Sequence, residues 1–310
     1  MFEIGREFTQ GMWTKIKRFL PQWVMAVVLL TFASCYPDEA KTPAKLRIGV
    51  LPDQDAAILK SRYSPLISYL KTRLQTEVEL VVPDTYQGLV LEFGSRKIDM
   101  GLFGGTTFVA SLVRHDAVPL VLRDVDLKFS TYFVAAQANP STKLRDFRDR
   151  RFSFGVKAST SGHLMPRHFM QQDGIEPEQF FSDVRYSGGH DKTIKHVLDG
   201  SIDLGAVNAE VVKTMLRDGR LRPGVLKIVW ETPPYADYVW AVQSDMDQTT
   251  RIRLQDAFLA LSTMREADAR ILEPMGTKGF LPARREDFTS LIAIMANLPA
   301  FRELAEKSDQ

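Results

Sequence analysis

The chain carries one pattern of strands, helices and glycine-bounded strand ends twice, and this repeat restricts its fold more than any other feature. Residues 94–101 read Gly-Ser-Arg-Lys-Ile-Asp-Met-Gly, and residues 200–205 read Gly-Ser-Ile-Asp-Leu-Gly. Each copy comes near the end of a series in which apolar strands alternate with helical segments. Such alternation is typical of α/β proteins with mostly parallel sheets. The sequence therefore predicts two similar α/β lobes.

The expected elements follow the same order in both halves. Strands are indicated by short apolar runs, and helices by apolar residues spaced three and four apart. The expected strands are 46–51, 78–82 and 98–103 in the first half and 152–156, 184–187 and 202–207 in the second. The expected helices are 64–74, 86–93, a segment ending near 172, and 194–198.

Two further β-rich segments, 131–136 and 238–242, flank the second half, and we interpret them as the crossings between the lobes. Residues from about 252 onward are helical and are expected to return to the first lobe. Two lobes joined by two crossings are expected to close about a hinge. The predicted organisation is a signal peptide (1–34), a tether (35–45), lobe 1 (46–134 with 240–310) and lobe 2 (135–239).

The N-terminus has the parts of a secretory signal: a basic flank (15–18), an apolar run (23–32) and small residues before Cys35. Pro21 leaves too short an apolar stretch for a typical membrane-spanning helix. Cys35 is the only cysteine, so an intrachain disulfide is excluded. The segment resembles the lipobox of bacterial lipoproteins, whose cysteine is acylated, although Phe32 stands where that pattern prefers Leu, Val or Ile. An uncleaved anchor helix remains the alternative.

The charge balance argues against a nucleic-acid partner. The chain has 40 basic and 38 acidic residues, and all of this excess lies in the predicted signal peptide. Nucleic-acid binding proteins usually carry a basic patch that contacts phosphates. Any anion that this protein binds is therefore expected to be held by a local site.

Ligands of open α/β sheets bind outside the carboxyl ends of the strands. Five segments follow such strand ends: 52–55, 103–107, 159–162, 187–190 and 208–210. The third reads Ser-Thr-Ser-Gly and opens a helix. A helix start offers free N–H groups and the positive end of the helix dipole, so three hydroxyls there favour an oxyanion site. An ordinary helix cap, which needs one hydroxyl, is the alternative.

Two titratable residues accompany these segments. His190 follows a Gly-Gly pair, and Asp237 lies near the second crossing. A structural histidine and a solvated turn carboxylate are the alternatives to functional roles. The histidines do not show the His-x-x-x-His spacing of a zinc helix, so neither a metal nor another cofactor is expected.

Together these motifs resemble the family of periplasmic phosphonate-, phosphite- and phosphate-type substrate-binding proteins. The resemblance spans about residues 46–265, and its most specific mark is Ser159-Thr-Ser-Gly162 followed by Gly189-His-Asp191. It implies a two-lobed, type II-like Venus-flytrap fold. Each lobe is then a mixed, mostly parallel sheet with flanking helices.

The resemblance also implies site residues. The Ser-Thr-Ser hydroxyls and amides would hold the phosphonate oxygens, two carboxylates would bind an amino or hydroxyl part of the ligand, and an early aromatic would line the site. In this sequence these residues are Ser159, Thr160, Ser161, His190, Glu210, Asp237 and Tyr63. The first-lobe loop departs from the family's Gly-Pro-x-x-Tyr pattern, so Thr106 or Thr107 would replace the phenol hydroxyl.

The expected function is therefore capture of a phosphonate- or phosphate-like oxyanion for an ABC importer permease, by a protein that is not an enzyme. Lipid on Cys35 would anchor it outside the cytoplasmic membrane. One alternative is a ligand-binding sensor subunit for a membrane kinase. Another is a hydrolase with Ser161 as nucleophile and His190 as base, but no Gly-x-Ser-x-Gly motif surrounds Ser161.

Overall fold

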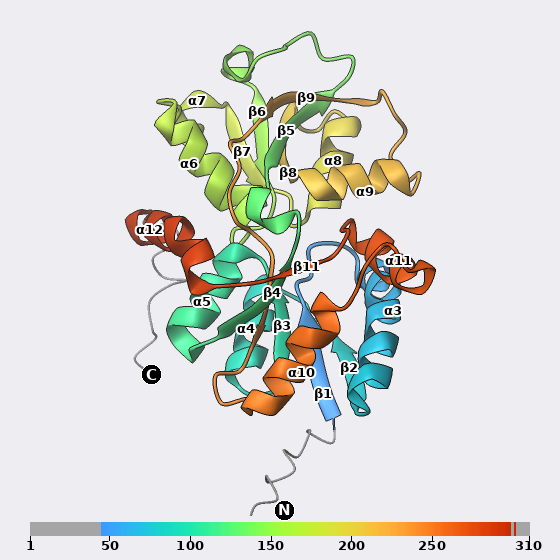
Figure 1. The fold of residues 1–310 in the computed structure, drawn as a ribbon. Coiled ribbons are helices and arrows are strands. Elements are labelled where there is room, and N and C mark those ends of the chain that lie inside the picture. The colour runs from blue at the N-terminus through green and yellow to red at the C-terminus, as the bar shows by residue number, and fades with distance from the viewer. Residues whose placement is uncertain (1–44, 299–300, 302–310) are drawn as a thin grey trace, which may run out of the picture. The chain divides into compact units, whose positions relative to one another are not determined.

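The computed structural model describes residues 45–298 and Phe301. The predicted signal peptide, Cys35 and all of the tether except Lys45 lie outside these residues. The described chain forms two mixed sheets, each with helices on both faces (Figure 1). We refer to each sheet with its helices as a lobe, so the predicted α/β class and two-lobed fold are confirmed.

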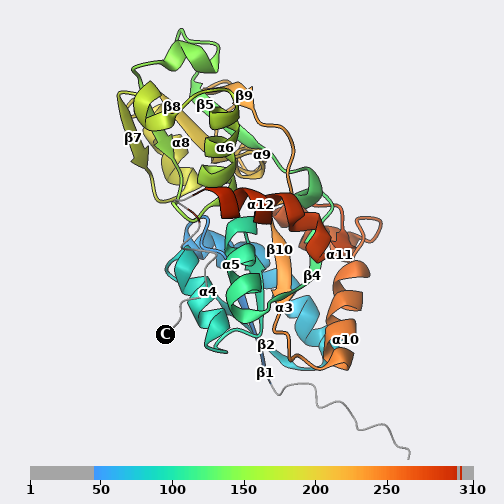
Figure 2. The ribbon, with the colours of Figure 1, turned by 90° about the vertical axis from the view of Figure 1, so that its left-hand side faces the viewer.

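The first lobe contains a six-stranded sheet in the order β11-β4-β10-β3-β1-β2. Its strands are β1 (Lys45–Val50), β2 (Glu77–Val81), β3 (Met100–Phe103), β4 (Val118–Arg123), β10 (Val239–Val242) and β11 (Phe280–Pro282). Helices α4 (Tyr86–Gly94) and α5 (Gly105–His115) lie on one face, and α3 (Ala56–Leu74) and α10 (Gln248–Leu259) lie on the other (Figure 2). Helices α11 (Glu266–Leu272) and α12 (Thr289–Asn297) complete this lobe.

The second lobe contains a five-stranded sheet in the order β7-β6-β8-β5-β9. Its strands are β5 (Thr131–Ala136), β6 (Arg151–Phe154), β7 (Asp183–Tyr186), β8 (Leu204–Asn208) and β9 (Leu226–Glu231). A phenylalanine-rich core under α6 (Met165–Gln172) and α7 (Pro177–Phe180) covers one face. An aliphatic core under α8 (His190–Leu198) and α9 (Ala209–Arg217) covers the other.

The two sheets repeat one plan, which explains the repeated Ile-Asp motif. In each, a central strand pairs in parallel with its two neighbours: β1 with β2 and β3, and β6 with β7 and β8. Asp99 accepts hydrogen bonds from the backbone N–H of Arg47 (2.8 Å) and from its guanidinium (2.6 and 3.0 Å). Asp203 does the same for Arg151, with three contacts of 2.9 Å. Each aspartate thus ties the segment before β3 or β8 to the parallel strand beside it, β1 or β6.

The interpretation of 131–136 and 238–242 as crossings is wrong. The first segment is β5, which pairs antiparallel with β8 and β9, and the second forms β10, between β3 and β4. Buried apolar runs of this kind satisfy their backbone groups best inside a sheet. The chain crosses instead at 124–130 and 232–238, where Phe129 and Tyr235 exchange backbone hydrogen bonds of 2.9 and 3.0 Å. The lobe boundaries placed at 134/135 and 239/240 fall within β5 and β10.

Several helices begin earlier than their sequence patterns indicate. Helix α3 starts at Ala56, because Asp55 accepts hydrogen bonds from two N–H groups of its first turn, and it continues through Pro65. The segments expected as loops at 103–107 and 208–210 largely form the first turns of α5 and α9. These changes matter for function, since they bring helix N-termini to the carboxyl ends of the strands.

Candidate functional site

The Ser-Thr-Ser segment lies between β6 and α6, within a π-helical turn, η4 (Thr160–Leu164). All three residues are buried, and the hydroxyls of Ser159 and Thr160 have different partners. Ser159 caps the turn, because its Oγ accepts a hydrogen bond from the N–H of Gly162 (2.9 Å). Thr160 reaches the first lobe, where its Oγ1 accepts bonds from the N–H (2.9 Å) and hydroxyl (3.1 Å) of Thr106. One hydroxyl therefore has the ordinary capping role, and one joins the lobes.

Four buried polar atoms near this segment have no hydrogen-bond partner among the described residues. They are Oδ1 of Asp53, the phenol oxygen of Tyr86, Nε2 of His190 and Oδ2 of Asp237. Asp53 and Tyr86 follow strands of the first lobe, His190 begins α8 in the second, and Asp237 lies on the second crossing. An unsatisfied buried polar group costs about 1–3 kcal/mol, so proteins rarely keep several together without a use for them.

His190 is placed to donate a hydrogen bond. Its Nδ1 accepts one from the N–H of Asn208 (3.3 Å), which leaves the hydrogen of a neutral ring on Nε2. Burial lowers the pKa of His190, opposed by the charge of Asp53, and so favours the neutral ring. The ring lies against the Ser-Thr-Ser turn, because a Cβ added to Gly162 would come within 3.0 Å of its Cε1.

Asp237 also lies beside this turn. Its Oδ1 accepts a hydrogen bond from the N–H of Gly105 at the start of α5 (2.8 Å). A Cβ added to Gly104 would lie 3.5 Å from both Asp237 Oδ1 and Thr160 Oγ1, so the carboxylate and the hydroxyl share one neighbourhood. Burial raises the pKa of Asp237 to about 7, although the Gly105 amide and the Thr160 hydroxyl act in the opposite direction.

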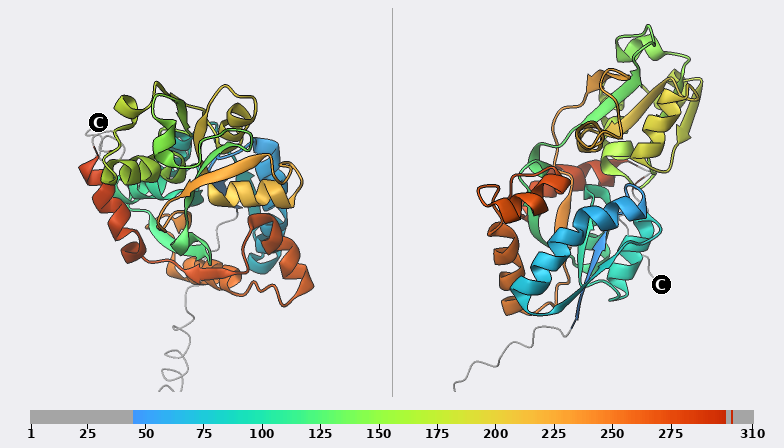
Figure 3. Two further views of the ribbon diagram at one scale, coloured as in Figure 1. Left: turned by 90° about the horizontal axis from the view of Figure 1, so that it is seen from above. Right: turned by 90° about the vertical axis from the view of Figure 1, so that its right-hand side faces the viewer.

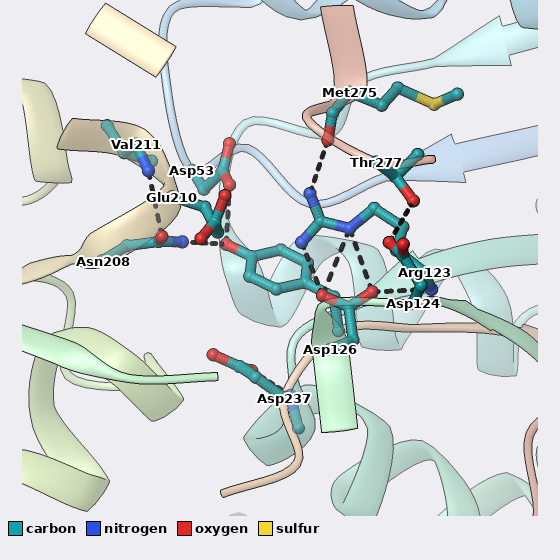
Figure 4. A network of polar contacts seen from close by, with 12 residues as sticks. Asp53, Arg123, Asp124, Asp126, Asn208, Glu210, Val211, Asp237, Met275 and Thr277 are labelled. Carbon is teal, nitrogen blue, oxygen red and sulfur yellow. Dashed lines mark hydrogen bonds and ion pairs between the residues drawn. The ribbon is translucent and has the colours of Figure 1, made fainter. Parts of the chain in front are cut away.

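A chain of hydrogen bonds crosses from the second lobe to Asp53 (Figure 4). The side-chain amide of Asn208 donates to the hydroxyl of Tyr238 (3.2 Å), which donates to Oδ2 of Asp53 (2.6 Å). Arg123 packs over the Tyr238 ring, 5.2 Å from its centroid. Its guanidinium, however, is bonded to both carboxylate oxygens of Asp126 and to the Met275 carbonyl. The positive charge of Arg123 is thus already balanced by Asp126.

Not all predicted site residues join this group. The Thr107 hydroxyl donates to the Gly104 carbonyl within α5 (2.9 Å), so Thr106 is the threonine that meets the turn. Glu210 pairs with Lys213 (2.7 Å), and Tyr63 packs edge-on against Trp240 with ring centroids 5.9 Å apart. Glu210 and Tyr63 instead line a small neighbouring cavity of about 20 Å³, together with Asp53, Arg123 and Asn208.

Sequence reasoning missed Asp53 and Tyr86. Asp53 stands in the 52–55 segment that the strand-end rule selects, but no single residue there was chosen. Tyr86 begins α4 shortly after β2, and Thr85 caps that helix. The rule that ligands bind beyond the carboxyl ends of strands, applied to β2, would have selected Tyr86 as well.

Residues of α3, α9 and α11 line a cleft of about 1350 Å³. These helices belong to both lobes, whose ribbons Figure 3 shows from two further sides. Arginines from both lobes line the cleft, including Arg62, Arg217 and Arg220. The side-chain oxygen of Gln54 accepts hydrogen bonds from Arg62 (3.2 Å) and Arg220 (3.3 Å), and thereby joins the lobes. Basic residues along a cleft raise the local concentration of anions.

Comparison with known proteins identifies the family. Residues 48–288 match the family described as ABC transporter, phosphonate, periplasmic substrate-binding protein. The chain belongs to this family. The probable ABC transporter phosphite binding protein PhnD1 of Prochlorococcus marinus (strain MIT 9301) is 30% identical over 272 residues, which cover 84% of this chain and 92% of PhnD1. The phosphate-import protein PhnD of Mycolicibacterium smegmatis is 28% identical over 229 residues, which cover 70% of this chain and 71% of that protein.

The structure of the same Prochlorococcus PhnD1 in complex with methylphosphonate is similar to this protein, with a TM-score of 0.78 and 28% identity. The match covers 83% of this chain and 99% of PhnD1. Family membership confirms the predicted role, a substrate-binding protein of an ABC transporter that captures its ligand for import. It also confirms that the chain is not an enzyme, and the donor role of His190 Nε2 gives the hydrolase alternative no base. No helix within the described residues is long and apolar enough to span a membrane.

Proposed function

We propose that this substrate-binding protein captures a small phosphorus oxyanion, either a phosphonate or an inorganic relative such as phosphite or phosphate. The carrying observation is the group of unpartnered buried atoms of Asp53, Tyr86, His190 and Asp237 around the Thr160 turn. The relatives' names support this ligand class, because they refer to phosphite, phosphate and methylphosphonate. An ABC importer permease is the partner that then receives the ligand.

In this proposal the oxyanion is held mainly by neutral donors. Thr160 and Ser161 offer hydroxyls and amides at the start of a helical turn, where the backbone dipole favours an anion. His190 Nε2–H and the Tyr86 hydroxyl offer further donors from opposite lobes. Donors from both lobes favour the closed arrangement once the ligand is bound. Glu210, Tyr63 and Thr107 then act on the ligand only indirectly.

A matched pair of substitutions at His190 tests the proposal. His190→Asn keeps an acceptor near the Nδ1 position for the Asn208 amide but loses the donor at Nε2. His190→Gln can restore a donor near Nε2. A hydrogen bond to a charged group contributes about 1.5–3 kcal/mol, so His190→Asn should weaken binding by about 10- to 100-fold, and His190→Gln by clearly less.

Calorimetry of both variants with methylphosphonate, phosphite and phosphate measures this difference, and melting temperatures monitor folding. Unchanged affinity in a folded His190→Asn protein would place the ligand elsewhere. A wild-type protein that binds none of the three ligands would contradict the ligand class itself.

We also propose that residues 1–34 are a signal peptide, and that acylated Cys35 and the tether up to residue 45 hold the lobes at the membrane surface. The support is the basic, apolar and small-residue order before the sole cysteine. Cys35→Ser should abolish labelling by a fatty-acid analogue and shift the protein out of the membrane fraction. Ser34→Ala, which keeps a small residue, is the control. Equal labelling of Cys35→Ser and wild type would contradict acylation.

A further inference from the structure

Two carboxylates of the proposed site each keep one buried acceptor oxygen without a partner among the described residues. Asp237 is 1% exposed and Asp53 is 7% exposed. Each uses one oxygen within the protein: Asp237 Oδ1 accepts from Gly105, and Asp53 Oδ2 accepts from Tyr238. Their other oxygens are unpartnered. An ionised carboxylate oxygen can only accept hydrogen bonds, so it opposes the oxygen of an ionised ligand.

The charged and titratable groups around Asp237 do not offset the repulsion between its ionised carboxylate and an ionised ligand. Arg123 on β4 is bonded to Asp126 in the following 3-10 turn, η2 (Asp126–Lys128), and these two charges act on Asp237 in opposite directions. The other charged group of the site is the Asp53 carboxylate, which adds to the opposition. The remaining groups are phenols and a neutral imidazole: Tyr86 from α4, Tyr235 and Tyr238 from the crossing, and His190 from α8. Burial raises the pKa of each of these phenols, so they stay protonated.

We propose that Asp237 and the bound oxyanion share one proton, so that the complex forms with either a protonated carboxyl or a P–OH group, but not with both partners fully ionised. The proposal rests on the oxyanion function proposed above. The shared proton identifies the ligand class as tetrahedral oxyanions that bind together with one proton. It also makes Asp237 the residue that sets the pH range of binding.

The proton is well placed on either partner. On Asp237, it would let Oδ2 donate to a ligand oxygen while Oδ1 keeps its bond to Gly105. On the ligand, it would be donated to Oδ2 as a P–OH hydrogen bond. Burial already favours the protonated carboxyl, and a pKa near 7 lets Asp237 exchange its proton at neutral pH. Phosphate monoesters titrate in the same region, with a second pKa of about 6.

The test is calorimetric titration with methylphosphonate at several pH values. Above the pKa values of both Asp237 and the ligand, formation of the complex must take up one proton. By linkage, the wild-type affinity should therefore fall about tenfold per pH unit there. Titrations in two buffers with different ionisation enthalpies should independently report uptake of about one proton.

Asp237→Asn is the decisive variant, because its amide can donate to an ionised oxygen while its carbonyl accepts from Gly105. It should bind methylphosphonate with little pH dependence and exceed wild-type affinity at the highest pH. Asp173→Asn is the control, since this exposed acid at the end of α6 should leave the wild-type pH slope unchanged.

A pH-independent wild-type affinity, or the same slope in Asp237→Asn as in wild type, would overturn the shared proton while leaving the oxyanion site intact. Failure of the proposed function looks different. In that case none of methylphosphonate, phosphite and phosphate would bind, or their binding would be unaffected by His190→Asn.

Discussion

Replacing Thr160 and Ser161 together by alanine is expected to weaken oxyanion binding by about 100-fold or more. Each hydroxyl that donates to an ionised ligand contributes about 1.5–3 kcal/mol, and each 1.4 kcal/mol is a factor of ten in affinity. Loss of Thr160 adds a second effect, because its Oγ1 accepts two hydrogen bonds from Thr106 across the lobes. The closed arrangement then loses a direct contact in addition to ligand donors.

Calorimetry with the phosphorus oxyanion that binds the wild type most tightly measures this loss of affinity. Stability should fall by only about 1–3 kcal/mol, the cost of leaving the Thr106 amide without its acceptor. Thr107→Ala is the matched control, because the Thr107 hydroxyl is equally buried but bonds within its own helix. A folded double variant with wild-type affinity would show that the turn does not hold the anion. A collapse of the melting temperature would show instead that the two side chains mainly hold the turn and its contact with Thr106 in place.

The similar plan of the two lobes was predictable from the sequence, because the Ile-Asp motif makes the same contacts in both. Ile-Asp follows a helix, and its aspartate bonds an arginine of the neighbouring parallel strand, Arg47 in β1 and Arg151 in β6. The positions of the two crossings between the lobes were not predictable from strand propensity. Segments 131–136 and 238–242 are recognisably β, but the sequence does not say whether a β segment bridges two sheets or completes one.

The site was predictable to the level of segments and less so to individual side chains. Asn208 and Glu210 both belong to the segment selected at the end of β8, and successive helical residues differ by about 100° around the axis. The start of α9 decides which of them faces the site. Because Asn208 caps the helix with a 3.1 Å bond to Val211, it joins the interlobe chain while Glu210 pairs with Lys213. The same dependence on helix phase turns Tyr63 toward Trp240.

Asp237→Asn is expected to stabilise the ligand-free protein at about pH 8 by a few kcal/mol. Burial raises the pKa of Asp237 from its ordinary value of 3.8 to about 7. The folded state therefore binds more protons than the unfolded chain between these values, and stability is lost as the pH rises through this window. At about 1.4 kcal/mol per pKa unit, the ionised carboxylate costs the folded protein on the order of 4 kcal/mol above pH 7.

Thermal unfolding of wild type and Asp237→Asn at about pH 4 and about pH 8 measures this cost. For proteins of this size 1 kcal/mol corresponds to about 2–4 °C, so the variant should melt several degrees higher at pH 8 and close to wild type at pH 4. Asp173→Asn, at an exposed position, should differ little at either pH. A variant that is less stable at pH 8, or an equal difference at both pH values, would contradict a buried carboxylate that titrates near neutrality. An acid that destabilises the empty protein fits the proposed use of its proton when the ligand binds, because perturbed pKa values cluster at functional sites.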